Sequence, residues 1–209
     1  MKHKTSTTQP EATLGYRLNH FMLRIRDPKE SLHFYTELMG LQSVFTRDVG
    51  PITIYYLGYP QSAEHQADSA AYARDTSPHE VLTQTLGLLE LCHFHGSEKL
   101  PRSSICSGAQ PPHLGFNHLG FTVPDVKTAV ARLRDAGVKI VKDLDEGVND
   151  LVPVTKWEKA ELGVATQEAS RGFIQILDQI AMIEDPVNLH QFWWLKANMW
   201  ADGAFRTVT

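Results

Sequence analysis

The sequence predicts an α+β protein built from two related halves, and three observations support this prediction. The dipeptide Asn-His occurs at Asn19-His20 and again at Asn117-His118, and a short apolar run follows each copy. An aspartate, a helical pattern and a glycine then follow each run in the same order. Each half also ends in an apolar segment that begins with glycine. Such an internal repeat indicates a duplicated structural unit.

The apolar runs after Asn-His predict a strand at the start of each half. An aspartate that can cap a helix follows each strand, and glycine, the usual residue beyond a helix C-terminus, follows each helical pattern. These residues are Asp27, Lys29–Met39 and Gly40 in the first half, and Asp125, Val126–Ala136 and Gly137 in the second.

Further strands are expected after both helices, in the segments Gln42–Thr46, Ile52–Leu57 and Val138–Val141. Each half then ends in an apolar strand led by glycine, Gly87–Phe94 in the first and Gly172–Asp178 in the second. Glu90 and Gln175 occupy the same place in these two last strands. The halves therefore match from their first strand to their last.

Three stretches interrupt this symmetry and define the expected domain organisation. One is polar and helix-poor, one is rich in Ser, Gly and Pro, and one is a tryptophan-rich tail. The expected parts are a flexible N-terminus at 1–15, a first module at 16–96 with a surface insertion at 60–84, a linker at 97–113, a second module at 114–184, and an aromatic C-terminal tail at 185–209. We expect the tail to pack on the body, on a partner subunit or over a pocket, because exposed aromatic side chains are costly.

Composition narrows the function classes. The chain has 209 residues, a formal net charge of −4 and two cysteines. It has no apolar run of the roughly 20 residues that a membrane span needs, and its first residues lack the apolar core of a signal peptide. Mild acidity argues against nucleic acid as a partner. We therefore expect a cytoplasmic globular protein that acts on a small molecule, with no nucleic acid and no membrane.

Four residues at equivalent places in the halves are candidates for a metal site: His20 and His118 on the first strands, and Glu90 and Gln175 on the last. Alternate side chains of a strand share a face, so Glu90 and Gln175 project from otherwise apolar sheet faces. A carboxylate there must be paired, protonated or bound to a metal. Two imidazoles, a carboxylate and an amide oxygen suit Zn, Ni, Co, Mn or Fe. Taken singly, each residue is more simply a hydrogen-bonded structural residue.

The same residues carry a family resemblance. The chain resembles glyoxalase I, of the vicinal oxygen chelate superfamily, over about residues 16–180. The segments that carry the resemblance are Asn19–Tyr35, Leu89–His93, Gly115–Asp125 and Gly172–Ile176. The resemblance implies a βαβββ module used twice, curved sheets around a divalent metal ion, and a homodimer. It also implies that the metal ligands are His20, Glu90, His118 and Gln175.

The chain departs from the family at the catalytic base. In the family the last ligand is a glutamate that moves the substrate proton, whereas this chain has Gln175. An amide accepts no proton near neutral pH, so Gln175 is expected to act as a neutral ligand or as a hydrogen-bond donor. The alternatives for the base are Glu90 released from the metal, a metal-bound hydroxide, and Glu168 from the preceding loop.

The expected substrate pocket is also altered. Arg24 and Lys142 match family residues that hold glutathione, but three other polar positions of the family are replaced by Phe94, Leu114 and Val148. Each charge-assisted hydrogen bond lost costs about 1.5–3 kcal/mol. The resemblance with these departures therefore implies an apolar substrate bound near Arg24, Phe94, Leu114 and Lys142, and it makes glutathione doubtful as a co-substrate.

The predicted function is a metal-dependent lyase or isomerase of the glyoxalase I type. Its ion would act as a Lewis acid and stabilise an enolate-type intermediate of a specialised, apolar carbonyl substrate. Two alternatives remain: a conventional lactoylglutathione lyase acting on methylglyoxal-glutathione, and a non-catalytic, resistance-type protein that binds a small molecule. An iron oxygenase is disfavoured, because the ring-cleaving members carry their carboxylate where this chain has Gln175.

Overall fold

The computed structural model describes residues 8, 10–105, 109–110, 113–116, 118–144, 146, 155–163, 177–186 and 194–197. For 109–110, 113–114 and 194–197 it describes the backbone alone. The chain forms two compact units. Unit 1 comprises Met1–Ile25 and Tyr35–Ser97, and unit 2 comprises Arg26–Phe34 and Glu98–Thr209. Each unit is described by itself below.

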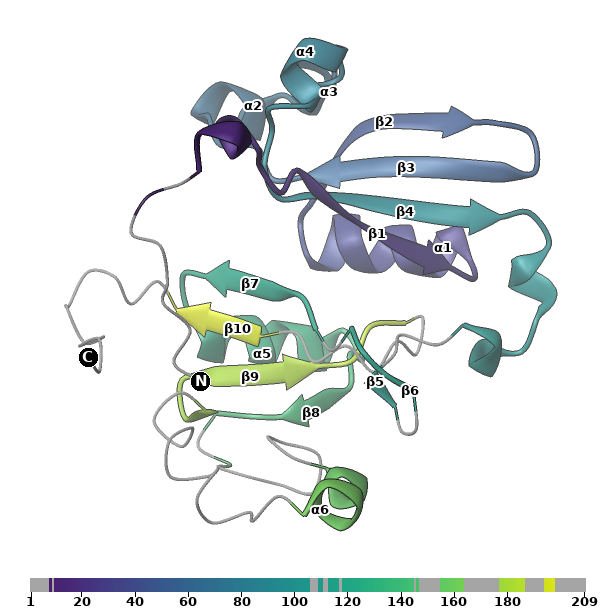
Figure 1. Ribbon diagram of the computed structural model, residues 1–209, viewed down its shortest axis with the longest axis vertical. Coiled ribbons are helices and arrows are strands. Elements are labelled where there is room, and N and C mark those ends of the chain that lie inside the picture. Colours follow the sequence, from purple (N-terminus) through teal and green to yellow (C-terminus); the bar gives the residue numbers. More distant parts are fainter. Residues whose placement is uncertain are drawn as a thin grey trace. The chain divides into compact units, whose positions relative to one another are not determined.

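Unit 1 is built on a four-stranded sheet with the strand order β1-β4-β3-β2 (Figure 1). The strands are β1 (His20–Ile25), β2 (Gln42–Asp48), β3 (Ile52–Gly58) and β4 (Leu88–Phe94). β1 lies parallel to β4, and the other neighbouring strands are antiparallel. All four predicted strands of the first half are confirmed.

The helix between β1 and β2 begins where the sequence predicts. It consists of α1 (Pro28–Leu32) and a π-helical continuation, His33–Leu38. The Asp27 carboxylate accepts a hydrogen bond from the Lys29 N–H at 2.9 Å, which caps the first turn. Gly40 follows with φ +79°, a conformation that glycine adopts without strain.

Two arginines explain why Arg26–Phe34 belongs to unit 2. The guanidinium of Arg26 donates to the Glu98 carbonyl at 2.6 Å and pairs with Glu30 at 3.1 Å. Arg102 pairs with the same Glu30 at 2.5 Å and donates to the Pro186 carbonyl at 2.8 Å. These contacts connect α1 to the segment around Glu98 and Arg102 and, through Arg102, to Pro186, which follows β9 in unit 2. The expected first module, 16–96, therefore does not coincide with unit 1.

The segment 60–84, predicted to be helix-poor, contains three short helices, so that expectation is wrong. They are α2 (Ala63–Ala67), α3 (Ser69–Thr76) and α4 (His79–Leu82). The side chains of Ser62 and Asp68 cap α2 and α3, so the polar residues that suggested a loop are helix caps. Tyr72 of α3 is 4% exposed and packs with Val44 and Leu88. The segment thus covers part of the sheet.

Unit 2 contains a second four-stranded sheet, with the order β7-β10-β9-β8 (Figure 1). Its elements are β7 (Gly120–Val123), α5 (Val126–Asp135), β8 (Ile140–Lys142), β9 (Ile180–Ile183) and β10 (Trp194–Ala197). Asp125 caps α5 through the Thr128 N–H, as predicted. Unit 2 also contains the 3-10 turn Arg102–Ser104, the strands β5 (Ala109–Gln110) and β6 (His113–Leu114), and α6 (Lys156–Leu162). Two further 3-10 turns are Glu11–Thr13, in unit 1, and Ser97–Lys99, where unit 1 ends and unit 2 resumes.

The last strand of the second sheet differs from the predicted one. The predicted segment Gly172–Asp178 lies outside the described residues except for Leu177 and Asp178, which are not in a strand. The strand beside β7 is β10, from the part of the chain that was assigned to the aromatic tail. β10 pairs with β7 in parallel, as β4 pairs with β1. In the described part of the second sheet, β10 thus holds the position that β4 holds in the first.

Both sheets place the first strand of the repeat beside the last and a helix between the first two strands. This is the βαβββ arrangement twice over, so the predicted α+β fold class is confirmed. No helix in the described residues is long and apolar enough to cross a membrane.

Gly58 is needed at the contact between β3 and α3. A Cβ atom at residue 58 would lie 2.4 Å from the Tyr72 hydroxyl oxygen and 2.9 Å from a Leu88 methyl carbon. The Tyr72 hydroxyl is buried, and no described residue forms a hydrogen bond with it. A side chain at residue 58 would therefore clash mainly with the Tyr72 hydroxyl, which forms no stabilising hydrogen bond with the described residues.

We predict that Gly58→Ala lowers the free energy of unfolding by about 1–3 kcal/mol through overpacking. Tyr72→Phe is expected to be neutral or stabilising by up to about 1 kcal/mol, because it removes an unsatisfied buried hydroxyl. The double variant should recover most of the loss, as measured by urea unfolding. Gly120→Ala, where nothing lies within 4 Å, is the control. Equal losses in the single and double variants would refute this explanation.

Candidate functional site

Two of the four predicted metal ligands meet on one face of the first sheet. Nε2 of His20, on β1, lies 3.3 Å from Oε2 of Glu90, on β4. The parallel register places His20 opposite Leu88. Glu90 is two residues beyond Leu88 on β4, so its side chain projects from the same face of the sheet. The two side chains therefore lie close together on one face of this sheet, and their role as metal ligands stays a prediction.

Asn19 determines which nitrogen of His20 carries a proton. The Asn19 amide nitrogen donates to the backbone carbonyls of Leu82, at 2.8 Å, and of Thr85. Its oxygen therefore faces Nδ1 of His20, at 2.8 Å. Because this oxygen can only accept, Nδ1 must carry the hydrogen. In neutral His20, the lone pair of Nε2 then points toward Glu90.

Two acceptors placed 3.3 Å apart need a positive charge between them, either a proton on Nε2 or a cation. Metal–nitrogen distances of about 2.0–2.1 Å and metal–oxygen distances of about 2.0–2.2 Å separate two ligands of a tetrahedral ion by roughly 3.3 Å. The spacing of the pair and its donor atoms therefore fit a divalent metal ion.

Tyr56, on β3, completes the surroundings of Glu90. Its hydroxyl donates to Oε2 of Glu90 at 2.8 Å, and its ring centroid lies 5.4 Å from that of His20. Burial, and then the hydrogen bond to Glu90, raise the pKa of Tyr56 well above its usual range. No motif in the sequence singles out this tyrosine. The signal that identifies it is the strand register, which places Tyr56 opposite Glu90.

The predicted substrate residues Arg24 and Phe94 also meet on this sheet. The Arg24 guanidinium carbon lies 4.6 Å from the centroid of the Phe94 ring, a cation–π contact. Phe94 is 37% exposed and Met22 is 49% exposed. Burial raises the pKa of the Cys92 thiol, and the Glu90 carboxylate adds to the effect while Arg24 opposes it. Cys92 is thus a buried, neutral thiol rather than a nucleophile.

His118 belongs to unit 2, and its side chain is half-buried. Burial lowers its pKa, which keeps the imidazole neutral near neutral pH. Neutral imidazole is the form that binds metals. His118 is therefore in a state suited to its predicted role, and that role stays a prediction.

Three predicted site residues contribute no side-chain geometry. Gln175 and Glu168 lie outside the described residues, and Leu114 is described only as part of the backbone of β6. Across the described part of the chain, no three His, Cys, Asp or Glu side chains lie together as a metal site would require. The structure thus brings two ligands together, and the complete set of four stays a prediction.

Lys142 does not have the surroundings of a substrate-binding residue. Its side chain is 0% exposed. Its ammonium donates to the carbonyls of Asp143 at 2.7 Å, Leu177 at 2.8 Å and Ile180 at 3.2 Å. Three carbonyls occupy the three N–H groups, so none is left for a ligand. The predicted contact of Lys142 with substrate is therefore replaced by a structural role.

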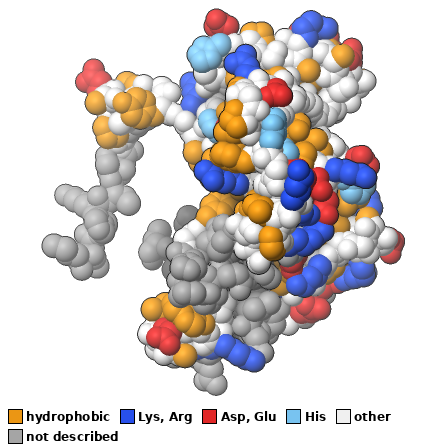
Figure 2. All heavy atoms as spheres, turned by 90° about the vertical axis from the view of Figure 1, so that its right-hand side faces the viewer, with side chains coloured by type: hydrophobic (Ala, Val, Ile, Leu, Met, Phe, Trp, Pro, Cys, Tyr) orange, Lys and Arg blue, Asp and Glu red, His pale blue; other side chains and the backbone are white. Residues whose placement is uncertain are grey.

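The charged side chains on the molecular face in Figure 2 are of both signs and are interspersed with apolar ones.

Comparison with known proteins agrees with the predicted fold class. Residues 17–152 match the family model of the Glyoxalase/Bleomycin resistance protein/Dioxygenase superfamily, so the chain belongs to that superfamily. It is 35% identical over 146 residues to a lactoylglutathione lyase of Pseudomonas aeruginosa, which covers 68% of this chain and 78% of that protein. Within the superfamily, the chain is a glyoxalase I-like member.

Two further comparisons differ in how much they cover. The chain is 35% identical over 132 residues to glyoxalase I of Saccharomyces cerevisiae, a match that covers 62% of this chain and 38% of the yeast protein. The solved structure of Leishmania major glyoxalase I has 19% identity and a TM-score of 0.49, over 88% of this chain and 87% of that one.

A structural role for Lys142 predicts a large effect on stability. Lys142→Met should lower the free energy of unfolding by about 2–4 kcal/mol, because carbonyls buried around the ammonium lose their donor. Lys139→Met is the matched control, since this exposed lysine pairs with Glu184 near the surface and should cost less than about 1 kcal/mol. Urea unfolding measures both. A Lys142→Met protein as stable as the control would contradict the structural role.

Proposed function

We propose that the chain is a metal-dependent lyase or isomerase of the glyoxalase I type. His20, Glu90 and His118 would hold a divalent ion, with Gln175 as a neutral fourth ligand. The substrate would be a specialised carbonyl compound with an apolar body rather than the hemithioacetal of glutathione. The proposal retains the homodimer and the cytoplasmic location expected from the sequence.

The His20–Glu90 pair is the observation that carries this proposal. Nε2 of His20 lies 3.3 Å from a carboxylate oxygen of Glu90, and the Asn19 oxygen holds the ring through Nδ1. The Glu90 carboxylate is held in turn by Tyr56. Outer hydrogen bonds of this kind orient metal ligands in many proteins. The similarity to lactoylglutathione lyases supports the same chemistry.

When bound, the ion would supply Lewis-acid polarisation of the substrate carbonyl. The protein's own groups orient the ligands and move the proton. Asn19 keeps the hydrogen of His20 on Nδ1, and Tyr56 holds Glu90 by one oxygen, which leaves the other free to accept a proton. Glu90 and Glu168 are the candidate bases, since the amide of Gln175 cannot accept a proton near neutral pH.

The apolar substrate is supported by residues on the same face of the sheet. Phe94 and Met22 are partly exposed beside the pair, and the guanidinium of Arg24 lies over the Phe94 ring. Lys142 is buried and fully engaged. Two of the cationic groups expected to hold glutathione therefore have partners within the protein.

Conventional lactoylglutathione lyase activity is the second candidate. It is favoured by the 35% identity to the Pseudomonas aeruginosa enzyme of that name. The two candidates share the fold and the ion, and they differ in the base and in the groups that bind substrate.

The first test is metal binding. We expect the purified protein to bind about one Zn²⁺ or Ni²⁺ per chain, and His20→Ala and Glu90→Gln to abolish tight binding. Tyr56→Phe should weaken affinity about 10- to 100-fold, because Glu90 loses the group that orients it. Tyr55→Phe is the matched control, a neighbouring tyrosine on the opposite face of β3. Competition titration with a chelating dye measures all four variants.

Failure to bind a divalent ion would contradict the proposed function and favour a non-catalytic binding protein. Equal affinities for the Tyr56→Phe and Tyr55→Phe proteins would contradict the role given to Tyr56.

The second test concerns the base. We expect the wild-type protein to convert methylglyoxal and glutathione to lactoylglutathione slowly or not at all, and Gln175→Glu to raise the rate by about 100-fold, within the range of general base catalysis. Formation of the thioester is followed by its ultraviolet absorbance, with Gln179→Glu as the control. A fully active wild-type protein would instead establish the conventional enzyme.

A further inference from the structure

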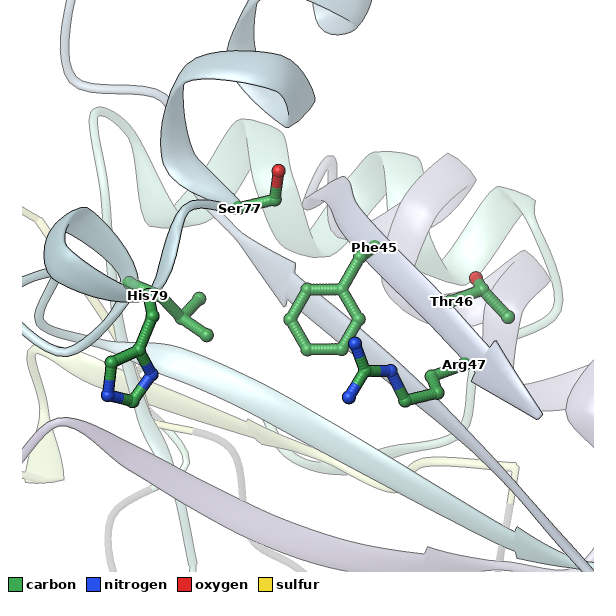
Figure 3. A pocket seen from close by; sticks show the side chains of 6 residues that line it. Phe45, Thr46, Arg47, Ser77 and His79 are labelled. Atoms are coloured by element: carbon green, nitrogen blue, oxygen red, sulfur yellow. The ribbon is translucent and has the colours of Figure 1, made fainter. Parts of the chain in front are cut away.

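A pocket of about 450 Å³ opens beside β2 in unit 1 (Figure 3). One wall comes from β2, and the other comes from α4 and the residue that follows α3. Its lining residues are Phe45, Thr46, Arg47, Ser77, His79 and Leu82. The volume is that of a small-molecule site. Among the described residues, the lining contains an aromatic ring, a guanidinium, an imidazole and two hydroxyls, and no carboxylate.

The polar side chains that line the pocket carry hydrogen-bond donors that a ligand could use. Within the described part of the chain, the side chains of Arg47, Ser77 and His79 form no hydrogen bond or ion pair. The acidic Asp75 of α3 is already held by Arg74 and His65. A guanidinium presents a rigid fork of N–H donors that matches a carboxylate. The pocket is therefore suited to an anionic group beside an apolar one.

Both walls of the pocket touch residues that hold the His20–Glu90 pair. The Phe45 ring stacks on Tyr56 with centroids 4.7 Å apart and planes 17° apart, and Tyr56 donates to Glu90. The Leu82 carbonyl accepts a hydrogen bond from Asn19, which orients His20. The pocket and the pair are thus parts of one connected surface within unit 1.

The distance between the pocket and the His20–Glu90 pair follows from the spacing of the strands. Phe45, Tyr56 and Glu90 are register partners across β2, β3 and β4. Neighbouring strands lie about 4.8 Å apart, so Phe45 and Glu90 are separated by roughly 10 Å. A ligand of drug-like size can span this distance.

We propose that this pocket binds the carboxylate end of the substrate, so that the substrate class is an aromatic keto acid whose carboxylate lies roughly 10 Å from the reacting carbonyl. Arg47 binds the carboxylate, His79 and Ser77 add donors, and Phe45 contacts the aromatic body. This inference rests on the proposed function, because the carbonyl is placed at the His20–Glu90 pair.

The test uses 4′-acetylbiphenyl-4-carboxylate, a rigid aromatic keto acid whose biphenyl spacer holds the carbonyl and the carboxylate roughly 10 Å apart, the spacing that the strands imply, and its uncharged methyl ester as probes. Binding to the full chain is measured by titration calorimetry, with Zn²⁺ and without. We expect the acid to bind at least about 10-fold more tightly than the ester, as one charge-assisted pair implies. Arg47→Gln should weaken binding of the acid about 10- to 100-fold and leave the ester unchanged, and His79→Gln should weaken the acid by a smaller factor.

Arg74→Gln is the matched control, because Arg74 is an exposed arginine of α3 outside the pocket, and it should leave both probes unchanged. Equal affinity for acid and ester, an unaffected Arg47→Gln protein, or no binding at all would overturn the inference.

The titrations with Zn²⁺ distinguish a failure of this inference from a failure of the proposed function. Zn²⁺ should tighten binding of the acid in the wild-type protein but not in Glu90→Gln. A chain that binds no Zn²⁺ defeats the proposed function. If such a chain still bound the acid through Arg47, the pocket would be an anion site and its role as the substrate's carboxylate end would be overturned.

Discussion

The candidate site depends on one hydrogen-bonded arrangement, the side chain of Asn19 between two backbone carbonyls and the His20 ring. Because the amide nitrogen is committed to Leu82 and Thr85, the amide oxygen faces Nδ1 of His20. The opposite nitrogen then presents a lone pair to Glu90. Two acceptors this close are unfavourable on their own, and either a proton on Nε2 or a bound cation makes the arrangement favourable. The segment 60–84, which supplies Leu82, is therefore linked directly to the geometry of the pair.

The sequence predicted the framework of the first sheet well, for local reasons. Strand alternation puts His20 and Glu90 on one face once their strands are adjacent, and the repeat made that adjacency plausible. Asp27 and Asp125 cap their helices because a capping aspartate acts on N–H groups two or three residues away. Interactions between residues so close in the sequence can be predicted without knowledge of the tertiary structure.

Features that depend on contacts between residues far apart in the sequence could not be predicted from local patterns. The bond from Tyr56 to Glu90 requires the register between β3 and β4, which no local pattern specifies. The burial of Lys142 depends on carbonyls some 35 residues later in the chain. The three helices of the segment 60–84 were hidden because their caps have the composition of a loop. The strand beside β7 could come from either of two apolar segments, and composition does not choose between them.

The membership of the chain in the glyoxalase superfamily and the departures at Gln175 and Phe94 are compatible. In the proposed function, the fold would bring a carbonyl compound to an ion, and the residues around the ion would decide which proton moves and which substrate fits. In this chain the cationic groups expected to hold glutathione are engaged or buried, while Arg47 and His79 line a separate pocket. The proposed function thus combines the metal chemistry expected of the family with a different substrate-binding surface.

The most direct measurement of the central claim is the ¹⁵N NMR spectrum of the His20 imidazole, recorded with and without one equivalent of Zn²⁺. The account predicts that Nδ1 keeps its hydrogen in both spectra and that the Nε2 resonance moves to the position of a metal-bound nitrogen when Zn²⁺ is added. A protonated Nε2 that is unchanged by Zn²⁺ would contradict it, because the pair would then be an ordinary ion pair.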